Sequence, residues 1–496
     1  MKKIIKTLLA LLMLIFISCF SNRAPQRPEM PIGSGTAIPN IPEPFSAVSV
    51  DPEGDSIAYR FDWGNGIVSN WSAFVASGDT YTTSYTYTTE GNFRVRCQAK
   101  DHKGKSSSWS DELLVRCGLG RIRWSFTCPD QGVFNSTAAI DANGNIYVGC
   151  ECGHLHSFTA SGSARWGMRG FVSNTEDEFI ASPAIADNGT IYACDRGGYV
   201  YALTDNKTLL WQRFLGAEIV GSVAVGRNNE IYVNTIDGFY ALSANGQTLW
   251  SIDSIQGVSS PTLDSNNFLY VGTSDHYLYC LDTSGTIRWR YALDDEIISS
   301  PAVMLNKRIC VGCQDGRIYF FHPDTGFILR TSSYGAVSST PVIGSDGSIY
   351  ITSEDGYLAK LDAMGNYLWS YPTDGYNTSS PTVVRYPELN QDIIYFKVSW
   401  GKKKGMVTRY EDEDSLYMIK ADGSRFAAVA LPQGYPSEEG LLSSPMIASD
   451  GTILIGAGFD EESESGGFFA LTGKGNLVNS SWPVFRHDIK NTGRKH

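Results

Sequence analysis

The stretch SEDGYLAKLDAMGNYLWSY, residues 353–371, decides the fold because it contains most of a unit that recurs along the chain. Short runs of alternating apolar and polar residues flank Asp355-Gly356, and Gly365 and Trp369 lie near its end. Asp-Gly between two alternating runs supplies the positive φ angles that a tight hairpin turn needs. The stretch therefore predicts a β-hairpin with a two-residue turn at Asp355-Gly356, followed by another strand that contains Trp369.

Related stretches recur from residue 121 onward. Each copy begins with Ser or Thr, usually before a proline, and continues with a polar turn and an apolar strand such as NIYVG or SIYIT. The eight starting residues are Ser136, Ser182, Ser222, Ser260, Ser300, Thr340, Ser380 and Ser444. The last strand repeats after 39 residues, from Trp211 to Trp250 and from Trp250 to Trp289. A period of about 40 residues with four strands per unit predicts an all-β, eight-bladed β-propeller with four-stranded blades.

The last strand of most units carries a tryptophan, usually as Gly-x-x-x-Trp. One four-stranded blade cannot bury both of its faces, so blades must stack around a ring. A large aromatic side chain at a constant place fills the gap between two blades. We therefore expect structural docking by Trp166, Trp211, Trp250, Trp289 and Trp369, with Arg330 at the tryptophan's place in the fifth copy.

The repeated unit with its Gly-x-x-x-Trp resembles the PQQ-type (quinoprotein-like) propeller repeat, and SSWPVFRHDIKNTGR (480–494) resembles an end segment of bacterial proteins in that group. Enzymes of the family place adjacent cysteines against the cofactor and hold calcium with acidic and amide side chains. This sequence contains no Cys-Cys pair. We therefore expect no catalytic residue, no cofactor site and no metal ligand. A PQQ- and calcium-dependent dehydrogenase is the alternative that the resemblance implies.

Two cysteine-rich stretches suggest metal or redox chemistry. In CECGHLH (150–156), a two-residue turn at Cys152-Gly153 would pair Cys150 with Leu155, so that Cys150 faces away from His154 and His156. The side chains would then not converge, and the pattern predicts no zinc site. CVGC (310–313) lies along a strand, where its two thiols diverge.

The other cysteines are expected to pack in cores. Ten cysteines occur in the chain, and nine remain without Cys19. An odd number leaves at least one thiol that cannot pair within the monomer. Cys97 and Cys117 lie on predicted neighbouring strands and are the expected disulfide.

The N-terminus has the features of an export signal. Lys2, Lys3 and Lys6 precede an apolar run over 8–17 that is too short for a comfortable membrane span. The run ends in FISC, which resembles the lipobox of bacterial lipoproteins although Phe16 replaces the usual leucine. The resemblance implies lipidation of Cys19 and anchoring at the cell envelope, with the outer membrane as the expected destination. An ordinary cleaved signal peptide is the alternative.

A small β-module precedes the repeats. Several short strands between turn residues over about 90 residues favour an immunoglobulin-like sandwich. DPEGDSIAYRFDWGNG and YTYTTEGNFRVRCQAKD resemble PKD and fibronectin type III-like modules of bacterial surface proteins, which implies a spacer or adhesion module. Alternate carboxylates at Asp51, Glu53 and Asp55 leave a calcium site open.

The domain boundaries follow from these segments. We expect a lipoprotein signal at 1–19, a Pro/Gly-rich tether at 20–43, the sandwich at 44–117, the propeller at 121–479 and an end segment at 480–496.

Composition limits the partners. Apolar residues make up 42% and charged residues 19% of the 496 residues, which permits a large core. A formal net charge of −12 argues against nucleic acid and anionic lipid surfaces. We therefore expect membrane contact through the lipid anchor only.

The sequence thus predicts a non-catalytic binding or scaffold protein of the cell envelope, with a protein or carbohydrate partner. An insertion in the seventh copy, SWGKKKGMVTRYEDED, interrupts the repeat where such proteins often carry recognition loops. Its candidate interaction residues are Trp400, Lys402, Lys403, Lys404 and Tyr410. A carbohydrate-binding or adhesion role would place exposed aromatic residues on such loops.

Overall fold

The computed structural model contains strands and turns but no helix among its described residues. It describes residues 22–494 except for 34, 131, 174, 176, 332–334, 374, 376, 378, 387–388, 400–413, 432–442, 461–464, 479, 481–482 and 489. The chain divides into two compact units, 1–121 and 122–496. Within the described part, no helical segment has the length and apolar character needed to span a bilayer.

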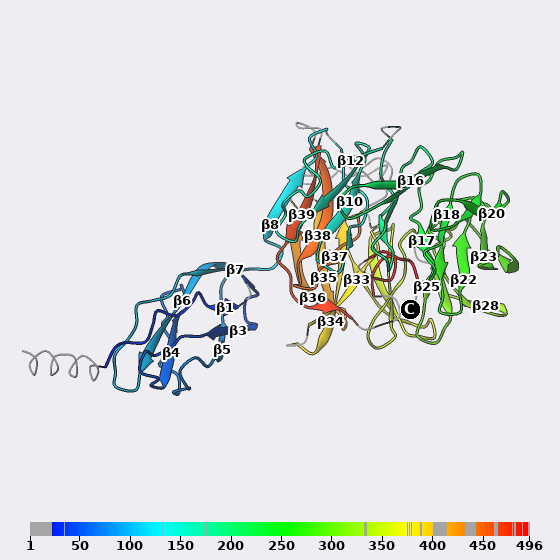
Figure 1. The fold of residues 1–496 in the computed structure, drawn as a ribbon. Coiled ribbons are helices and arrows are strands. Elements are labelled where there is room, and N and C mark those ends of the chain that lie inside the picture. Colours follow the sequence, from blue (N-terminus) through cyan, green and yellow to red (C-terminus); the bar gives the residue numbers. More distant parts are fainter. Residues whose placement is uncertain are drawn as a thin grey trace, which may run out of the picture. The chain divides into compact units, whose positions relative to one another are not determined.

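The first unit is a sandwich of two sheets (Figure 1). One sheet has the order β1-β3-β5 and the other β2-β7-β6-β4. Alternate residues of β3 and β6 are buried, as expected when one face of each sheet covers a shared core. Phe45, Phe61, Trp63, Tyr87 and Val95 belong to that core. The strands are β1 (Ile32–Gly33), β2 (Thr36–Ala37), β3 (Pro42–Ala47), β4 (Ile57–Asp62), β5 (Tyr81–Thr86), β6 (Gly91–Asp101) and β7 (Leu113–Cys117).

Residues 22–43 belong to this sandwich, so the tether predicted for 20–43 is wrong over its described part. Strands β1 and β2 lie within it, and Ala37 of β2 pairs with Cys117 of β7. Upstream, the Arg23 guanidinium bonds the Glu53 carboxylate at 2.6 Å. Prolines are compatible with edge strands and loops, where a missing N–H breaks no ladder bond, so a Pro-rich composition did not exclude strands here.

The second unit forms eight sheets among its described residues (Figure 1). Six have four strands in chain order, the seventh gains β40 at its inner edge, and the eighth ends in β8. The first four sheets contain β9 (Ala139–Ile140), β10 (Ile146–Cys150), β11 (His154–Phe158), β12 (Phe171–Val172); β13 (Ala184–Ile185), β14 (Ile191–Cys194), β15 (Tyr199–Leu203), β16 (Leu209–Phe214); β17 (Ala224–Val225), β18 (Ile231–Asn234), β19 (Phe239–Leu242), β20 (Thr248–Ile252); and β21 (Thr262–Leu263), β22 (Phe268–Gly272), β23 (Tyr277–Asp282), β24 (Ile287–Ala292). The last four contain β25 (Ala302–Val303), β26 (Ile309–Gly312), β27 (Ile318–His322), β28 (Gly326–Arg330); β29 (Val342–Ile343), β30 (Ile349–Ser353), β31 (Tyr357–Leu361), β32 (Tyr367–Pro372); β33 (Thr382–Tyr386), β34 (Gln391–Val398), β35 (Ser415–Lys420), β36 (Arg425–Ala430), β40 (Asn476–Leu477); and β37 (Met446–Ile447), β38 (Ile453–Asp460), β39 (Ser465–Leu471), β8 (Ile122–Thr127).

Strand β8 closes the ring, because it comes first in the sequence of this unit but pairs with β39 of the last sheet (Figure 1). Phe126 faces Phe468 and Trp124 faces Ala470 across this pair. The last sheet thus contains strands from both ends of this unit, and backbone hydrogen bonds between them close the ring. This pairing is therefore the seam of the ring.

Tryptophans join six of the eight described sheets to the next. The indole Nε1 of Trp211 donates to Ala244 O at 2.8 Å, and that of Trp250 donates to Thr283 O at 2.9 Å. A Cβ added to Gly246 would lie 2.7 Å from the Trp211 ring, so the glycine of one unit provides the space for the tryptophan of the preceding unit. Equivalent indole-to-carbonyl bonds are made by Trp124, Trp166, Trp289 and Trp369.

The fifth unit differs from its predicted alignment. Leu329, and not Arg330, occupies the tryptophan's place, since Leu329 pairs with Phe320 as Trp289 pairs with Cys280. Arg330 is exposed and pairs with Asp294. Gly326 lies three residues before Leu329, whereas Gly285 lies four residues before Trp289, so the Gly-x-x-x spacing pointed one residue too far along the strand.

The hairpin between the second and third strands has a three-residue loop, so the predicted two-residue turn is wrong. Ser353 pairs with Tyr357 across Glu354, Asp355 and Gly356. Only Gly356 adopts a positive φ, of 91°. A three-residue loop with glycine at its left-handed position is the next most common hairpin connection, and it also contains an Asp-Gly pair.

Candidate functional site

A ring of hydroxyl side chains lines the centre of the propeller. One residue comes from the start of the first strand in each sheet: Thr137, Ser182, Ser222, Ser260, Ser300, Thr340, Ser380 and Ser444. Thr137 N donates to Ser182 Oγ at 2.8 Å, and Ser444 N donates to Thr137 Oγ1 at 3.0 Å. The same bond links four other neighbouring pairs. These hydroxyls are therefore largely used to hold the sheets together.

The C-terminal segment also occupies the centre. Arg486 is fully buried and donates to the carbonyls of Pro261 and Val223 at 2.6 and 2.5 Å. Burial lowers the pKa of this guanidinium, because its charged form is separated from water. Asn491 Nδ2 donates to Thr137 O, Ala138 O and Pro183 O. The segment thus binds the first strands of several sheets at once.

Backbone bonds extend this contact. Ile185 N donates to Lys490 O, Val225 N to Thr492 O, and Leu263 N to Gly493 O, all at 2.8 to 2.9 Å. The segment therefore adds a strand-like edge to the innermost strands of three successive sheets. The remaining cavity, lined by the hydroxyl ring and Phe485, has a volume of about 100 Å³.

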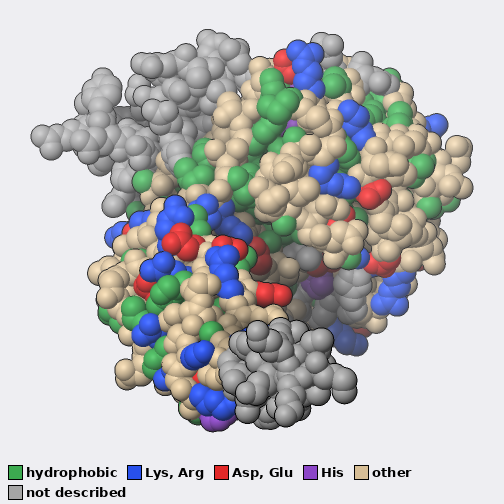
Figure 2. Space-filling view, turned by 60° about the vertical axis from the view of Figure 1, so that its left-hand side comes forward, with side chains coloured by type: hydrophobic (Ala, Val, Ile, Leu, Met, Phe, Trp, Pro, Cys, Tyr) green, Lys and Arg blue, Asp and Glu red, His purple; other side chains and the backbone are tan. Residues whose placement is uncertain are grey.

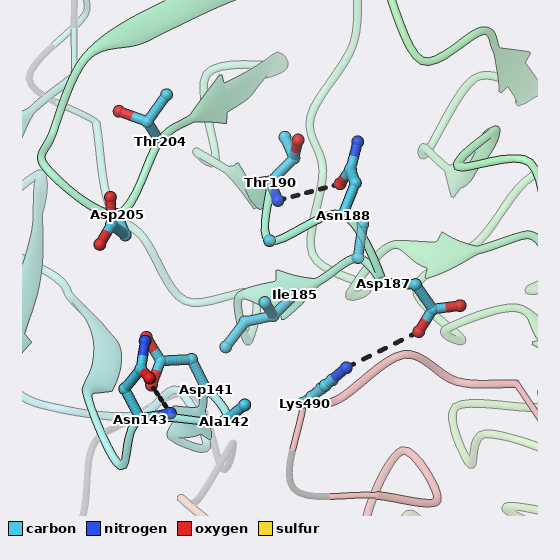
Figure 3. Close-up of a pocket in the computed structure, with 12 residues that line it drawn as sticks. Asp141, Ala142, Asn143, Ile185, Asp187, Asn188, Thr190, Thr204, Asp205 and Lys490 are labelled. Atoms are coloured by element: carbon cyan, nitrogen blue, oxygen red, sulfur yellow. Dashed lines mark hydrogen bonds and ion pairs between the residues drawn. The ribbon is translucent and has the colours of Figure 1, made fainter.

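A second hollow lies between loops of the first two sheets and has a volume of about 370 Å³. Its lining includes Asp141, Asp187, Asp205 and Lys490 (Figure 3). Asp141 accepts bonds from the backbone of Asn143 at 2.8 Å, and Asp187 pairs with Lys490 at 3.7 Å. Asp205 pairs with Arg165 at 3.5 Å, so these carboxylates already cap a turn or pair with a cation.

Two cysteines and two histidines converge beside the seam. One ligand atom each from Cys128, Cys152, His154 and His156 lies within 4.8 Å of the others. Cys128 directly follows β8, while the other three belong to the loop and second strand of the β10–β11 hairpin. The Cys128 and Cys152 sulfurs are 2.7 Å apart, and Cys128 Sγ lies 3.8 Å from His156 Nε2.

This cluster is enclosed. Cys128, His154 and His156 are 2, 5 and 1% exposed, whereas Cys152 is half-buried. The His156 ring lies 5.0 Å from the Phe126 ring. Neighbouring thiols of Cys150 and Cys152 lower the pKa of Cys128 by hydrogen bonding to it.

The prediction that these side chains do not converge is wrong. Cys150 pairs with His154 and Val148 with His156, because the loop has three residues instead of two. A one-residue change of register moves a side chain to the other face of the sheet. Cys128 was not considered because it lies outside the CECGHLH stretch. The only signal for its place is that RIRWSF (121–126) has the character of an outer strand without inner strands before it.

Cys150 Sγ lies 2.7 Å from Cys152 Sγ, while the other thiols pack away from this cluster. Among the described cysteines none forms a disulfide. The expected Cys97–Cys117 bond is wrong, because Cys117 pairs with Gly91 and Cys97 lies six positions further along β6. Cys310 and Cys313 contact different carbonyls, those of Ala302 and Asp295, and burial raises the pKa of Cys313 to about 12.

The carboxylates proposed for calcium have other partners. Asp51 Oδ1 accepts the backbone N–H groups of Glu53 and Asp55. The Glu53 and Asp55 side chains pair with Arg23 and Lys103 respectively. This arrangement is that of a polar turn.

Several predicted residues lie outside the described part of the chain. They are the lipidation candidate Cys19 and the candidate interaction residues Trp400, Lys402, Lys403, Lys404 and Tyr410.

The fold and its centre define a closed β-propeller preceded by an immunoglobulin-like sandwich. Comparison with family models identifies a PKD domain over residues 33–111. The family model described as outer membrane protein assembly factor BamB matches residues 151–256 and 238–329. The predicted repeat type and module are thereby confirmed. No curated protein matches the chain.

One solved structure supports the fold. BamB from Moraxella catarrhalis is 16% identical with a TM-score of 0.53, covering 72% of this chain and 98% of that one. This likeness confirms the predicted β-propeller. The PKD domain of an M14-like peptidase from Thermoplasmatales archaeon SCGC AB-540-F20 is 32% identical with a TM-score of 0.19, covering 20% of this chain and 99% of that one. A europium-containing methanol dehydrogenase is 12% identical with a TM-score of 0.48, covering 63% of this chain and 81% of that one.

Proposed function

We propose that this protein is a non-catalytic scaffold of the cell envelope, associated with the outer membrane, whose propeller presents a surface to a protein partner. The lipobox-like FISC supports export and anchoring, and the repeats match a model named for an outer membrane assembly factor. The PKD domain acts in this proposal as a spacer between the anchor and the ring.

The filled centre of the ring carries the proposal. A quinone cofactor with its calcium needs a cavity of the size that ligand pockets usually have, about 300–1,000 Å³. The cavity left beside Phe485 measures about 100 Å³, and the buried Arg486 and Asn491 occupy the space around it. The residues at the centre of the ring therefore do not fit PQQ.

Exposed apolar side chains on the outer strands support a binding role. They lie on β16, β20, β24 and β32, the outermost strands of four sheets: Leu209, Leu210, Phe214, Leu249, Ile287, Tyr291, Tyr367 and Leu368. Exposed apolar residues that gather on one surface mark protein interaction sites. Acidic and basic side chains are interspersed on the surface that Figure 2 shows.

Site-specific photocrosslinking tests this function. A photoreactive residue at Phe214, Leu249 or Leu368 is expected to give a discrete adduct with an outer-membrane protein in intact cells. Leu305 is equally exposed but lies between the first two strands of the fifth sheet, and it serves as the control. Equal labelling from all four positions, or none from the outer strands, would contradict the proposal.

Titration with PQQ and Ca²⁺ tests the enzymatic alternative. No saturable change in the absorbance of PQQ is expected, because the central cavity is too small for it. A tight, stoichiometric optical change would favour a dehydrogenase.

A further inference from the structure

The cysteine–histidine cluster has the ligand set of a structural metal site. Two thiols and two imidazoles form the Cys₂His₂ combination that binds Zn²⁺ tetrahedrally. Cys128, Cys152, His154 and His156 bring their ligand atoms within 4.8 Å of one another, although 24 residues separate the first two in the sequence. The stretch CECGHLH thus contributes three of the four ligands, and the residue after β8 contributes the fourth.

Each of the two imidazoles has a ring nitrogen that forms no hydrogen bond with the protein. Both Nδ1 atoms are buried and lack a hydrogen-bond partner in the structure. A buried nitrogen without a partner costs free energy, so this arrangement points to a missing ligand. Asp130 Oδ2 lies 3.5 Å from His154 Nδ1 but forms no hydrogen bond with it.

We propose that Cys128, Cys152, His154 and His156 bind a zinc-type divalent ion that fastens the seam of the propeller. Binding releases one proton from each of the two thiols while both histidines stay neutral, so the filled site carries no net charge. A neutral complex suits a buried position far better than an uncompensated ion does.

The sulfurs must separate slightly to take the ion. Zn–S bonds of about 2.3 Å in a tetrahedron place two sulfurs about 3.8 Å apart. The Cys128 and Cys152 sulfurs lie 2.7 Å apart, so a shift of about 1 Å is needed. Cys152 sits in the three-residue loop and is half-buried, which gives it room to move and gives the ion a path inward.

The place of the cluster explains what the ion would do. Cys128 ends the outer strand of the eighth sheet, and His154 and His156 belong to the first sheet. Residues of both sheets, including Phe126, Phe158 and Phe468, share one core there. A metal across this joint ties the last sheet to the first, next to the strand that receives the chain from the PKD domain.

A Cys128–Cys152 disulfide is the competing assignment. It would leave both imidazoles buried and unpartnered, which is why the metal is favoured. The two assignments differ in metal content and in thiol count, so one preparation distinguishes them.

Metal analysis of the full chain provides the test. The protein is purified under reducing conditions, treated with Zn²⁺ and passed through a desalting column. About one zinc per chain is expected, as in other four-ligand sites. Co²⁺ in place of Zn²⁺ should give the intense visible absorption of a tetrahedral thiolate complex, which reports the ligands directly.

Matched variants complete the experiment. Cys128→Ser and His156→Gln should each lose the bound metal and the Co²⁺ spectrum, while Cys310→Ser, which alters a buried thiol of the fifth sheet, should keep both. Circular dichroism verifies that each variant is folded, and His154→Gln replaces any that is not. The proposal is overturned if the reduced wild-type chain retains no zinc, or if the Co²⁺ spectrum survives these ligand substitutions, whatever disulfide the oxidised chain contains.

Discussion

The β10–β11 hairpin and the β26–β27 hairpin have the same backbone register but carry different side chains. Both have a three-residue loop, since Cys150 pairs with His154 in the register of the two strands and Cys313 N donates to Arg317 O. In the first hairpin the loop carries Cys152. In the fifth sheet the same place carries Asp315.

Four positions can be matched between the two hairpins, and a fifth in the strand that precedes the loop leading to each of them. Cys150, Cys152, His154 and His156 correspond to Cys313, Asp315, Arg317 and Tyr319. Cys128, the first residue after β8, corresponds to Leu293, the first residue after β24.

In the β26–β27 hairpin, the polar side chains bond one another. Tyr319 Oη donates to Asp315 Oδ2 at 2.6 Å, and the Arg317 guanidinium pairs with the same carboxylate at 2.9 Å. The apolar Leu293 packs into the core of this region. The first group instead places two thiols and two imidazoles together and leaves both Nδ1 atoms unpartnered. The repeat thus tolerates either set, and the side chains alone decide whether a site for an ion exists.

Zinc should affect only the first hairpin, and this is the largest expected effect. A ligand that binds only the folded chain at a thousand times its dissociation constant raises the free energy of unfolding by about 4 kcal/mol. Chemical denaturation with and without zinc measures it. Cys313→Ser should retain the increment and His156→Gln should lose it, whereas equal increments in both variants would contradict the assignment.

Gly132→Ala should destabilise the protein by about 2 kcal/mol, because overpacking in a filled site forces its neighbours to shift. A Cβ at this position would lie 2.4 Å from Cys150 Sγ and 2.5 Å from Cys152 N. Asp295 is the matched control. It directly precedes Glu296, as Gly132 directly precedes Val133, and the carbonyls of Glu296 and Val133 accept equivalent backbone hydrogen bonds from the two hairpin loops. Asp295→Ala should change stability by about 0.5 kcal/mol or less. Urea denaturation of both variants checks the difference, and similar losses in the two would argue against crowding at the cluster.

Asp315→Asn should cost about 1.5 kcal/mol at neutral pH, because it weakens hydrogen bonds made to a charged group. Burial raises the pKa of Asp315, but bonds from Tyr319 and Arg317 outweigh it and lower the pKa below its ordinary value. The charged form is therefore stabilised by folding. This stability is present above the unfolded pKa of about 3.9 and is lost as pH falls through the lower folded value. Denaturation curves between neutral and acidic pH should show the wild type and variant converging, and a constant gap would refute the assignment.

The repeat was predictable because its turns and aromatic residues depend on local geometry. The Ser/Thr starts and the spacing between Trp211, Trp250 and Trp289 led to the four-stranded units. The seam was also foreseeable, since RIRWSF has the character of an outer strand without inner strands before it. The Ser/Thr starts and the tryptophans recur in most units, and a residue type that recurs at one position of a repeat indicates the same structural role in each copy.

Loop length was not predictable from the same signals. Asp-Gly occurs in both two- and three-residue hairpin loops, so Cys152-Gly153 did not reveal the register of its strands. That one residue decided whether Cys150 and His154 share a face. The tryptophan's place at Leu329 was missed because Gly326 lies only three residues before it, so that the Gly-x-x-x spacing ends at Arg330.

Local patterns in the sequence thus determined an all-β chain with an immunoglobulin-like module and a ring of repeated blades, because alternation and turn residues act over a few neighbours. Ring closure decided the rest. It brought Cys128 from the start of the ring to His156 of the first sheet and placed Arg486 of the C-terminal segment at the centre. Both contacts join segments that meet only when the ring shuts, so no pattern within either segment records them.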